Sequence, residues 1–383
     1  MQRQSSPKPK AVLWVTALLL CLILLLNAAT FLRTPPSFLA GENRMRATAP
    51  AFSWQALADG SYTRGLESWF SDRFAGRDNW LALHNALHAA MGQRDSGGVY
   101  LGKNDTLFLI PSPVNETALS ANLAAMNAFA ARHKDLRHTA LIAPNAVCVW
   151  ADRLPDHAPV PDQQAQLQQV ADRLQGVTFA NVTDALLAHK QEDLYYRTDH
   201  HWTTPAARIA LEAAAPAMGL DRLVSEYDDY TVSQTFEGTL ASKSGRHGTP
   251  DAIHILLPKT DVRYNVTDPN GEKATLFDRA KLDTKDQYAV FLGGNHPLVT
   301  IKTTAQTGRR LLLFKDSYAN CFAPLLTPYY EEILLVDPRY YYDTADALVR
   351  QHGITDVLYL YNADTFFTDT TLADVLVAET VPE

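Results

Sequence analysis

Short apolar runs alternate with helix-like stretches in two parts of the chain, and this alternation is what most limits its possible folds. Residues 139–143 and 177–182 have the composition of buried strands in the first part. In the second part, residues 311–314, 332–336 and 356–361 do so. Strands that alternate with helices form a parallel sheet with right-handed crossovers. We therefore predict an α/β fold.

The stretch between these two parts has a different character. Residues 220–304 contain alternating apolar and polar segments separated by Gly, Asp, Asn and Pro. This pattern is typical of short strands joined by turns. We predict a β-rich insertion here, carried by a single α/β domain over residues 51–383.

An uncharged apolar stretch lies near the N-terminus, at residues 11–32. At about 1.5 Å per residue, such a helix spans a hydrocarbon layer roughly 30 Å thick. Arg3, Lys8 and Lys10 precede it without any acidic residue, so the positive-inside rule places residues 1–10 in the cytoplasm. We expect a single-pass signal anchor in the cell membrane, a linker at 33–50 and an extracytoplasmic domain. A cleaved signal peptide is the alternative.

Overall charge and cysteine content narrow the function further. The chain has 383 residues with 34 Lys and Arg against 42 Asp and Glu, a formal charge of −8. Nucleic-acid binding calls for clustered basic residues, so it is not expected. Cys21 lies in the apolar stretch, whereas Cys148 and Cys321 follow it. A disulfide between the latter two is possible and is not required.

Three side chains far apart in the sequence have the chemistry of a hydroxyl nucleophile system. Ser317 follows an apolar run at the start of a helix-like segment, and Asp199 and His201 lie two residues apart before another helix. In extended backbone, residues two apart point the same way, so His200 would point to the opposite side. We predict that Ser317 attacks, His201 takes its proton and Asp199 orients the imidazole.

Other residues are candidates for oxyanion or substrate contacts. Asn362 and Asn145 each follow an apolar strand, where parallel strands bring functional groups together. The Asn362 amide and the Ser317 N–H are the predicted oxyanion donors, and Asn145 is a weaker candidate. Trp202 is expected to wall the pocket or stack on a sugar ring. Asn295 follows two glycines and is either a turn residue or a substrate contact.

Simpler interpretations exist for the same residues. Ser317 and Asp199 could cap helices. Asp199, His200 and His201 could bind a metal ion, but adjacent histidines in extended backbone diverge and no further ligand is evident. We therefore expect neither a metal nor a cofactor.

Several motifs occur along the chain at separate positions. They are residues 98–102, 199–202, 238–240, 242–245, 293–295, 315–320 and 358–362. With these motifs the chain resembles the DHHW protein family of bacteria from about residue 42 to the end. That family is similar to the SGNH-hydrolase-like proteins of alginate O-acetylation.

The resemblance implies an SGNH-like three-layer sandwich whose motif order is circularly permuted. Ser317 then stands for the usual Gly-Asp-Ser block, with Lys315 where Gly is usual, and Asn362 stands for the oxyanion Asn. Residues 338–340 stand where another block usually supplies a Gly donor, so Arg339 would replace that donor.

The resemblance also implies a function and partners. The expected activity is that of a serine esterase or O-acyltransferase, acting with acetyl groups on a cell-surface or secreted polysaccharide. A membrane-bound O-acyltransferase would be its partner. The alternative is a non-catalytic glycan-binding or scaffold subunit of a polysaccharide acetylation system.

Overall fold

The computed structural model describes residues 9–32, 38–39, 44–268, 270 and 272–377. These residues form two compact units, Met1–Gln93 and Arg94–Glu383, called here the N-terminal and the C-terminal unit. Residues 51–93, which we had predicted to lie in the α/β domain, cluster with the N-terminal unit.

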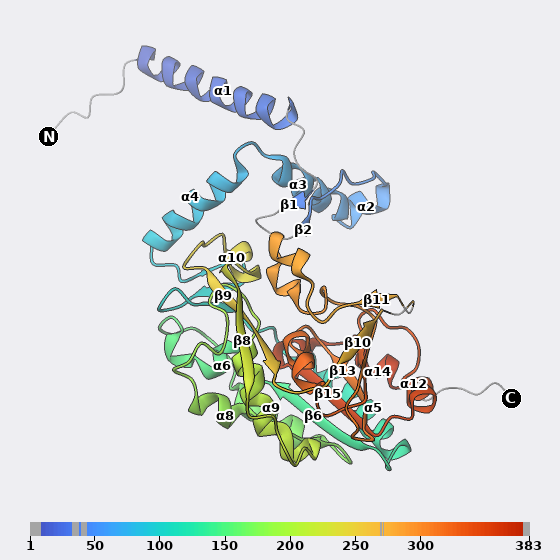
Figure 1. Cartoon of the computed structure of the whole chain (residues 1–383). Coiled ribbons are helices and arrows are strands. Elements are labelled where there is room, and N and C mark those ends of the chain that lie inside the picture. The colour runs from blue at the N-terminus through green and yellow to red at the C-terminus, as the bar shows by residue number, and fades with distance from the viewer. Residues whose placement is uncertain (1–8, 33–37, 40–43, 269, 271, 378–383) are drawn as a thin grey trace. The chain divides into compact units, whose positions relative to one another are not determined.

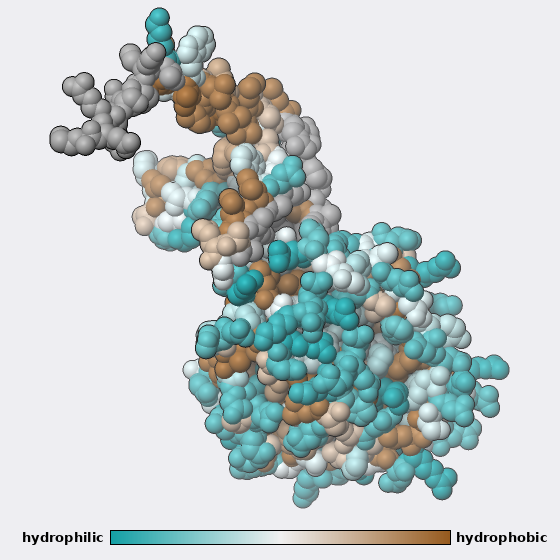
Figure 2. Space-filling model, turned by 90° about the vertical axis from the view of Figure 1, so that its left-hand side faces the viewer, coloured by the Kyte–Doolittle hydropathy of each residue, from teal (hydrophilic) through white to brown (hydrophobic). Residues whose placement is uncertain are grey.

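Helices dominate the N-terminal unit. It contains α1 (Pro9–Leu32), β1 (Phe38–Leu39), β2 (Arg44–Met45), α2 (Trp54–Ala58), α3 (Ser61–Arg73) and α4 (Arg77–Ala90). The segment Val12–Leu32 of α1 has a mean hydropathy of 2.6 and is long and apolar enough to cross a membrane. Its side chains are hydrophobic along the helix (Figure 2). This finding is compatible with a membrane anchor, and the orientation of that anchor stays a prediction.

A central sheet of eight strands organises the C-terminal unit. The strands lie in the order β11 (Lys273–Ala274), β10 (Tyr264–Thr267), β12 (Leu298–Thr303), β14 (Glu332–Val336), β13 (Arg310–Lys315), β15 (Asp356–Asn362), β6 (Arg137–Ala143) and β7 (Thr178–Phe179). The five strands from β14 to β7 are parallel. The three strands at the other edge are antiparallel. The predicted parallel sheet is therefore confirmed.

The order of the parallel strands explains the permuted motifs. If numbering starts at β13, the order β14-β13-β15-β6-β7 becomes 2-1-3-4-5, a common order in doubly wound folds. The chain enters this sheet at its fourth strand. In such sheets, ligands bind at the carboxyl ends of the strands where the order reverses, which here is between β13 and β15.

Helices cover both faces of the sheet, which makes three layers (Figure 1). One core joins alternate strand residues such as Leu313 and Leu358 to α8 (Thr183–Ala188) and α9 (Thr204–Met218). The other joins Leu312 and Val357 to α5 (Glu116–Arg132), α7 (Gln163–Arg173) and helices of the C-terminal region. These are α12 (Ala345–His352), α13 (Ala363–Thr368) and α14 (Leu372–Val375).

The predicted insertion is rich in strands, but it is not a separate layer. It contains the antiparallel pair β8 (Tyr227–Phe236) and β9 (Asp251–Pro258), with α10 (Thr239–Ser244) between them. Its later strands, β10 to β12, add to the central sheet. A small sheet of β3 (Asp95–Ser96), β4 (Val99–Leu101) and β5 (Leu107–Leu109) precedes the first parallel strand.

The cysteines are separate thiols in this structure. Cys148 is half-buried, Cys321 is buried, and both are free. Burial raises the pKa of the Cys148 thiol to about 11 and that of Cys321 to about 12. Neither is an activated nucleophile, because reactive cysteines need a lowered pKa.

Candidate active site

A tight turn after β13 presents Ser317. Its neighbours Asp316 and Tyr318 are buried, whereas Ser317 itself is half-buried. The Asp316 carboxylate accepts hydrogen bonds from the backbone N–H of Tyr318 (2.8 Å) and of Asn362 (2.8 Å). Asp316 therefore ties the turn to the end of β15, and α11 (Ala319–Phe322) starts directly behind it.

A second loop, before α9, carries Asp199 and His201. Thr203 begins the helix by accepting a hydrogen bond from the N–H of Ala206. The Asp251 carboxylate accepts from the backbone N–H groups of Arg197 (2.8 Å) and Thr198 (2.9 Å). These bonds satisfy two of the loop's backbone donors and tie the loop to β9.

Asp199, His201 and Ser317 form one continuous hydrogen-bonded chain. His201 Nδ1 lies 2.5 Å from Asp199 Oδ1, and His201 Nε2 lies 2.7 Å from Ser317 Oγ. Because the ionised carboxylate only accepts, Nδ1 carries the proton and Nε2 accepts from the serine hydroxyl. The structure thus brings together the three groups that the sequence singled out.

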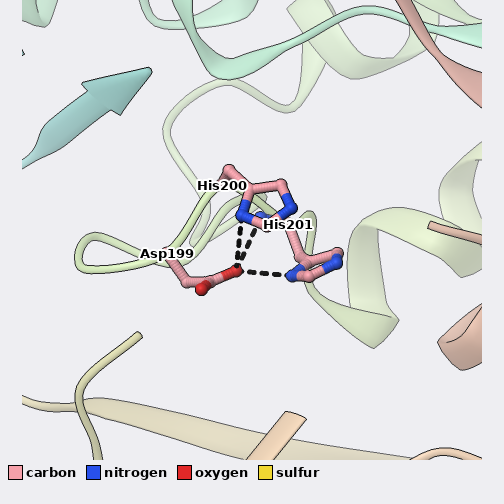
Figure 3. A group of neighbouring side chains, drawn as sticks. All are labelled: Asp199, His200 and His201. Carbon is pink, nitrogen blue, oxygen red and sulfur yellow. Dashed lines mark hydrogen bonds and ion pairs between the residues drawn. The ribbon is translucent and has the colours of Figure 1, made fainter. Parts of the chain in front are cut away.

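His200 does not point away from this group, so that prediction was wrong. Its ring centroid lies 3.9 Å from that of His201, and its Nδ1 lies 3.5 Å from Asp199 Oδ1. Figure 3 shows both imidazoles on the same side as the carboxylate. The backbone is a turn here because Asp199 Oδ1 accepts from the N–H of His201 (3.0 Å), and a turn abolishes the alternation of an extended strand.

The Asp199 carboxylate is buried and fully engaged. Its second oxygen accepts from the backbone N–H (2.7 Å) and the hydroxyl (2.9 Å) of Thr239. Burial by itself raises the pKa of Asp199, but the two neighbouring imidazoles and these hydrogen bonds lower the pKa well below its usual range. Asp199 is therefore ionised at any working pH, as an orienting carboxylate must be.

Gly238 leaves the space that Asp199 occupies. A Cβ atom at Gly238 would lie 2.2 Å from Asp199 Cβ and 2.3 Å from Asp199 Oδ2. For the ester hydrolysis that the sequence analysis predicts, we expect Gly238→Ala to displace the carboxylate and lower kcat by about 10²-fold, since small misplacements of catalytic groups have effects of this size. Steady-state kinetics would measure the loss. Gly248→Ala is the matched control, because a Cβ there meets no atom closer than 3.8 Å; equal kinetics of the two variants would contradict the assignment.

Aromatic side chains fix the two loops relative to each other. Tyr288 stacks on His201 with ring centroids 3.8 Å apart, and its hydroxyl donates to the carbonyl of Ser317 (3.1 Å). Tyr318 donates from its hydroxyl to the carbonyl of His200 (2.6 Å). Trp202 donates from Nε1 to the carbonyl of Tyr318 (2.9 Å). These bonds hold His201 against Ser317.

Trp202 is therefore not a wall of the pocket. It is 0% exposed and stacks on Phe322, so it cannot contact a sugar ring. Its role in the structure is to join the loop before α9 to the turn after β13.

The side-chain amides of Asn362 and Asn145 are occupied. Asn362 Nδ2 donates to Asp316 Oδ2 (2.6 Å) and to Thr365 Oγ1 (2.7 Å), which uses both of its hydrogens. Asn145 Nδ2 donates to Asn362 Oδ1 (3.1 Å) and to the hydroxyl of Tyr318 (3.4 Å). As arranged here, neither amide has a donor left for an oxyanion, which corrects both predictions. The Ser317 N–H donates to no acceptor among the described residues.

Lys315, Asp337 and Arg339 form a charged cluster at the ends of β13 and β14. Lys315 Nζ is buried and lies 3.6 Å from Asp337 Oδ2 and 3.1 Å from Asn295 Oδ1. Asp337 also accepts from Arg339 through Nε (2.8 Å) and Nη2 (2.6 Å). Burial lowers the pKa of Lys315 to about 8. Lys315 and Asp337 are buried, whereas Asn295 is exposed and Arg339 is partly exposed. Only the latter two groups of this cluster are therefore accessible to solvent.

Asp199, His200 and His201 also have potential metal-ligand atoms within 4.8 Å of one another. However, both nitrogens of His201 are already bonded, one to Asp199 and one to Ser317. His200 Nδ1 lies 2.8 Å from the Thr239 hydroxyl. The donor set is arranged as a proton-transfer chain, and it does not fit the four-ligand geometry of zinc.

A three-layer fold with a mostly parallel sheet and a serine turn at its switch point is the architecture of an SGNH hydrolase-like domain. Residues 99–294, just over half of the chain, match the family described as the SGNH hydrolase-like domain of the acetyltransferase AlgX. The chain belongs to this family. The matched residues include Asp199 and His201 and end before Ser317, which the structure places beside them.

Solved structures with the same fold agree with this assignment. A DHHW family protein from Eubacterium siraeum has a TM-score of 0.63 and 23% identity, covering 74% of this chain and 95% of that one. PatB1 from Bacillus cereus, solved with a sulfonyl adduct, has a TM-score of 0.60 and 19% identity, covering 71% and 97%. No curated protein matches the chain. The resemblance to DHHW proteins and the SGNH-like fold are thus confirmed.

Sequence reasoning missed several residues that support the site. Gly238 and Thr239 belong to a motif noted in the sequence, but no role had been assigned to them. Asp251 and Tyr288 lie within the predicted insertion, and nothing in their local sequence indicates that they contact the loop before α9.

Proposed function

We propose that this protein is a membrane-anchored serine esterase or O-acyltransferase that transfers acetyl groups. The observation that carries the proposal is the unbroken chain from Asp199 through both nitrogens of His201 to Ser317 Oγ. This is the arrangement by which a neutral hydroxyl becomes a nucleophile. The membership in an acetyltransferase-related family supports the acetyl group as the acyl unit.

The proposed reaction has two steps. Ser317 Oγ attacks the acyl carbonyl while His201 Nε2 takes the serine proton, and Asp199 stabilises the imidazolium through Nδ1–H. The tetrahedral intermediate collapses when the leaving alcohol takes that proton, which leaves an acyl-Ser317. A water or sugar hydroxyl then attacks the acyl-enzyme, with His201 Nε2 again accepting and returning the proton.

The developing oxyanion needs hydrogen-bond donors. The free Ser317 N–H is the first donor in our proposal. Arg339 is the proposed second donor. Its Nε and Nη2 bind Asp337, and its side chain is 35% exposed, so the guanidinium is held in place and remains accessible. Asn362 would act indirectly, by holding Asp316 and the serine turn in place.

The proposed location and substrate follow from α1 and from the family. An extracytoplasmic domain behind a single membrane span would reach a cell-surface or secreted polysaccharide. The acyl donor would come from a membrane-bound O-acyltransferase, which is the partner that we propose. Asn295 is a proposed substrate contact, because it is exposed beside Lys315.

A second candidate function is a non-catalytic glycan-binding or scaffold subunit. The observation that favours it is the occupied Asn362 amide, which leaves the oxyanion site without the donor that the motif order implies. This candidate keeps glycan binding and predicts no reaction at Ser317.

The Ser317→Ala variant separates the two functions. In the full-length protein in detergent, we expect it to lower aryl-acetate hydrolysis by at least about 10⁴-fold, because the nucleophile is removed. Release of the phenol would be followed by absorbance. Ser225→Ala, at an exposed loop serine, is the control and should keep the full rate. Unchanged hydrolysis in Ser317→Ala would reject the mechanism.

A further inference from the structure

The N-terminal unit exposes many large apolar side chains besides those of α1. Trp54 is 77% exposed, Leu87 is 55% exposed and Met91 is 73% exposed. Phe52, Leu57, Leu66, Trp80, Leu81 and Leu83 are also exposed. Large exposed apolar side chains that gather on a surface mark contact with a partner or with a membrane.

Helix α4 concentrates part of this surface on one side. Trp80, Leu83, Leu87 and Met91 follow one another at intervals of three or four residues, so they lie on the same face. At 100° per residue, the described polar residues Arg77, His84 and His88 lie along one edge of this apolar stripe. This is the pattern of a helix that lies at a boundary between water and an apolar phase.

The last turn of α1 contacts the neighbouring helices of the same unit. Thr30 is fully buried, and its hydroxyl accepts a hydrogen bond from the N–H of Ala75 (3.1 Å). The ring of Phe31 lies 6.4 Å from Trp69 and 6.1 Å from Phe70, measured between centroids. Because the apolar span ends at Leu32, these contacts bring the end of α3 and the turn before α4 to the level where the span leaves the hydrocarbon.

We propose that α3 and α4 lie on the bilayer surface, with the exposed face of α4 among the lipid headgroups and upper acyl chains. A lipid is the occupant because the unit that carries this surface also packs, through α3 and the turn before α4, against the end of the apolar helix α1. Its chemistry also fits the interface, where Trp and amphipathic side chains gather. Arg73 lies over the ring of Trp69, 5.2 Å from its centroid. Such a pair of a cation and an aromatic ring suits the headgroup region of a bilayer. Figure 2 shows hydrophobic side chains on α1 and also on the remainder of the N-terminal unit.

This surface adds a second membrane contact to the span. The inference depends on α1 crossing the membrane and does not depend on the proposed catalytic function. Lipid contact and ester hydrolysis are measured separately. A negative result for the membrane contact of α4 would therefore not reject the proposed catalytic function, and the reverse also holds.

Lipid quenching of a fluorescent residue tests the proposal. The full-length protein would be placed in phosphatidylcholine–phosphatidylglycerol nanodiscs, with a solvent-sensitive fluorescent amino acid at position 87. We expect a blue-shifted emission that nitroxide lipids quench. A reporter at position 20 in α1 should be quenched by deep nitroxides, and one at the 90% exposed Tyr342 should remain unquenched.

A charged double variant provides the matched comparison. With the reporter at position 91, Leu83→Glu combined with Leu87→Glu should abolish quenching, while the exposed positions leave folding intact. Emission at 87 that is no more quenched than at 342 would overturn the proposal. A blue-shifted but unquenched signal at 87 would do the same, because protein and not lipid would then cover the helix.

Discussion

Replacing Asp199 by Asn is expected to lower kcat for aryl-acetate hydrolysis by about 10⁴-fold, although the two side chains have nearly the same shape. Oδ1 accepts from His201 N–H and Nδ1–H, and Oδ2 accepts from Thr239 N–H and its hydroxyl. An amide has to place its NH2 at one of these two positions. At Oδ1 it would favour the His201 tautomer protonated on Nε2, which cannot take the proton of Ser317.

The matched control is Asp193→Asn in the same loop region, since the Asp193 side chain is 75% exposed and pairs with Arg197. This variant should keep the wild-type kcat. Circular dichroism of both variants would show whether the fold is retained. If a folded Asp199→Asn protein lost less than about tenfold in kcat, Asp199 would not orient the base in the way we propose.

The Asp337→Asn variant is expected to lose about 3–5 kcal/mol of unfolding free energy, because removing one partner of a buried ion pair leaves charge uncompensated. Asp337 is 0% exposed, and its carboxylate serves both Lys315 and Arg339. Denaturant unfolding would measure the loss. The difference in unfolding free energy between the wild type and Asp337→Asn should become smaller at pH above about 8, because the buried Lys315 is then already neutral in the wild-type fold.

An exposed ion pair supplies the comparison for this variant. Asp156 binds Lys103 at 3.1 Å, and the Asp156 side chain is 82% exposed. Asp156→Asn should change stability by less than about 1 kcal/mol, since solvent screens such pairs. If Asp337→Asn were as mild as Asp156→Asn, the buried cluster at the ends of β13 and β14 would not contribute to the stability of the fold.

Regular elements of the fold were predictable because their patterns are local. The apolar run 332–336 coincides with β14, and the helix expected after His201 is α9. The permuted motif order was implied by the family resemblance, and the strand order of the sheet agrees with it. The boundary of the N-terminal unit was not predicted, because helical periodicity does not show which helices pack together.

Local geometry at the site was harder to predict. The extended backbone assumed for Asp199 to His201 is replaced by a turn that the Asp199 side chain itself stabilises. The motif position of Asn362 suggested a free amide, but Asp316 and Thr365 take both hydrogens. Particular side-chain hydrogen bonds decide both outcomes, one within a turn and one between the distant residues Asp316 and Asn362. Sequence periodicity does not indicate such bonds.

The support for Asp199 also lies far along the chain. Thr239 is 40 residues away in α10, and Gly238 beside it supplies the necessary space. Both are brought to the loop by the β8–β9 pair, whose register depends on tertiary packing. The sequence therefore indicated Asp199, His201 and Ser317, but it did not indicate the residues, such as Gly238 and Thr239, that hold Asp199 in place.

The central claim is that Ser317 carries the acyl group between donor and acceptor. Mixing the full-length protein with an aryl acetate, stopping the reaction with acid and analysing the peptides by mass spectrometry tests it most directly. We predict the mass of one acetyl group on the peptide containing Ser317, and none in Ser317→Ala. Two results would contradict the account. One is steady turnover with the acetyl group on a residue other than Ser317, and the other is steady turnover without any acetylated peptide after the acid stop.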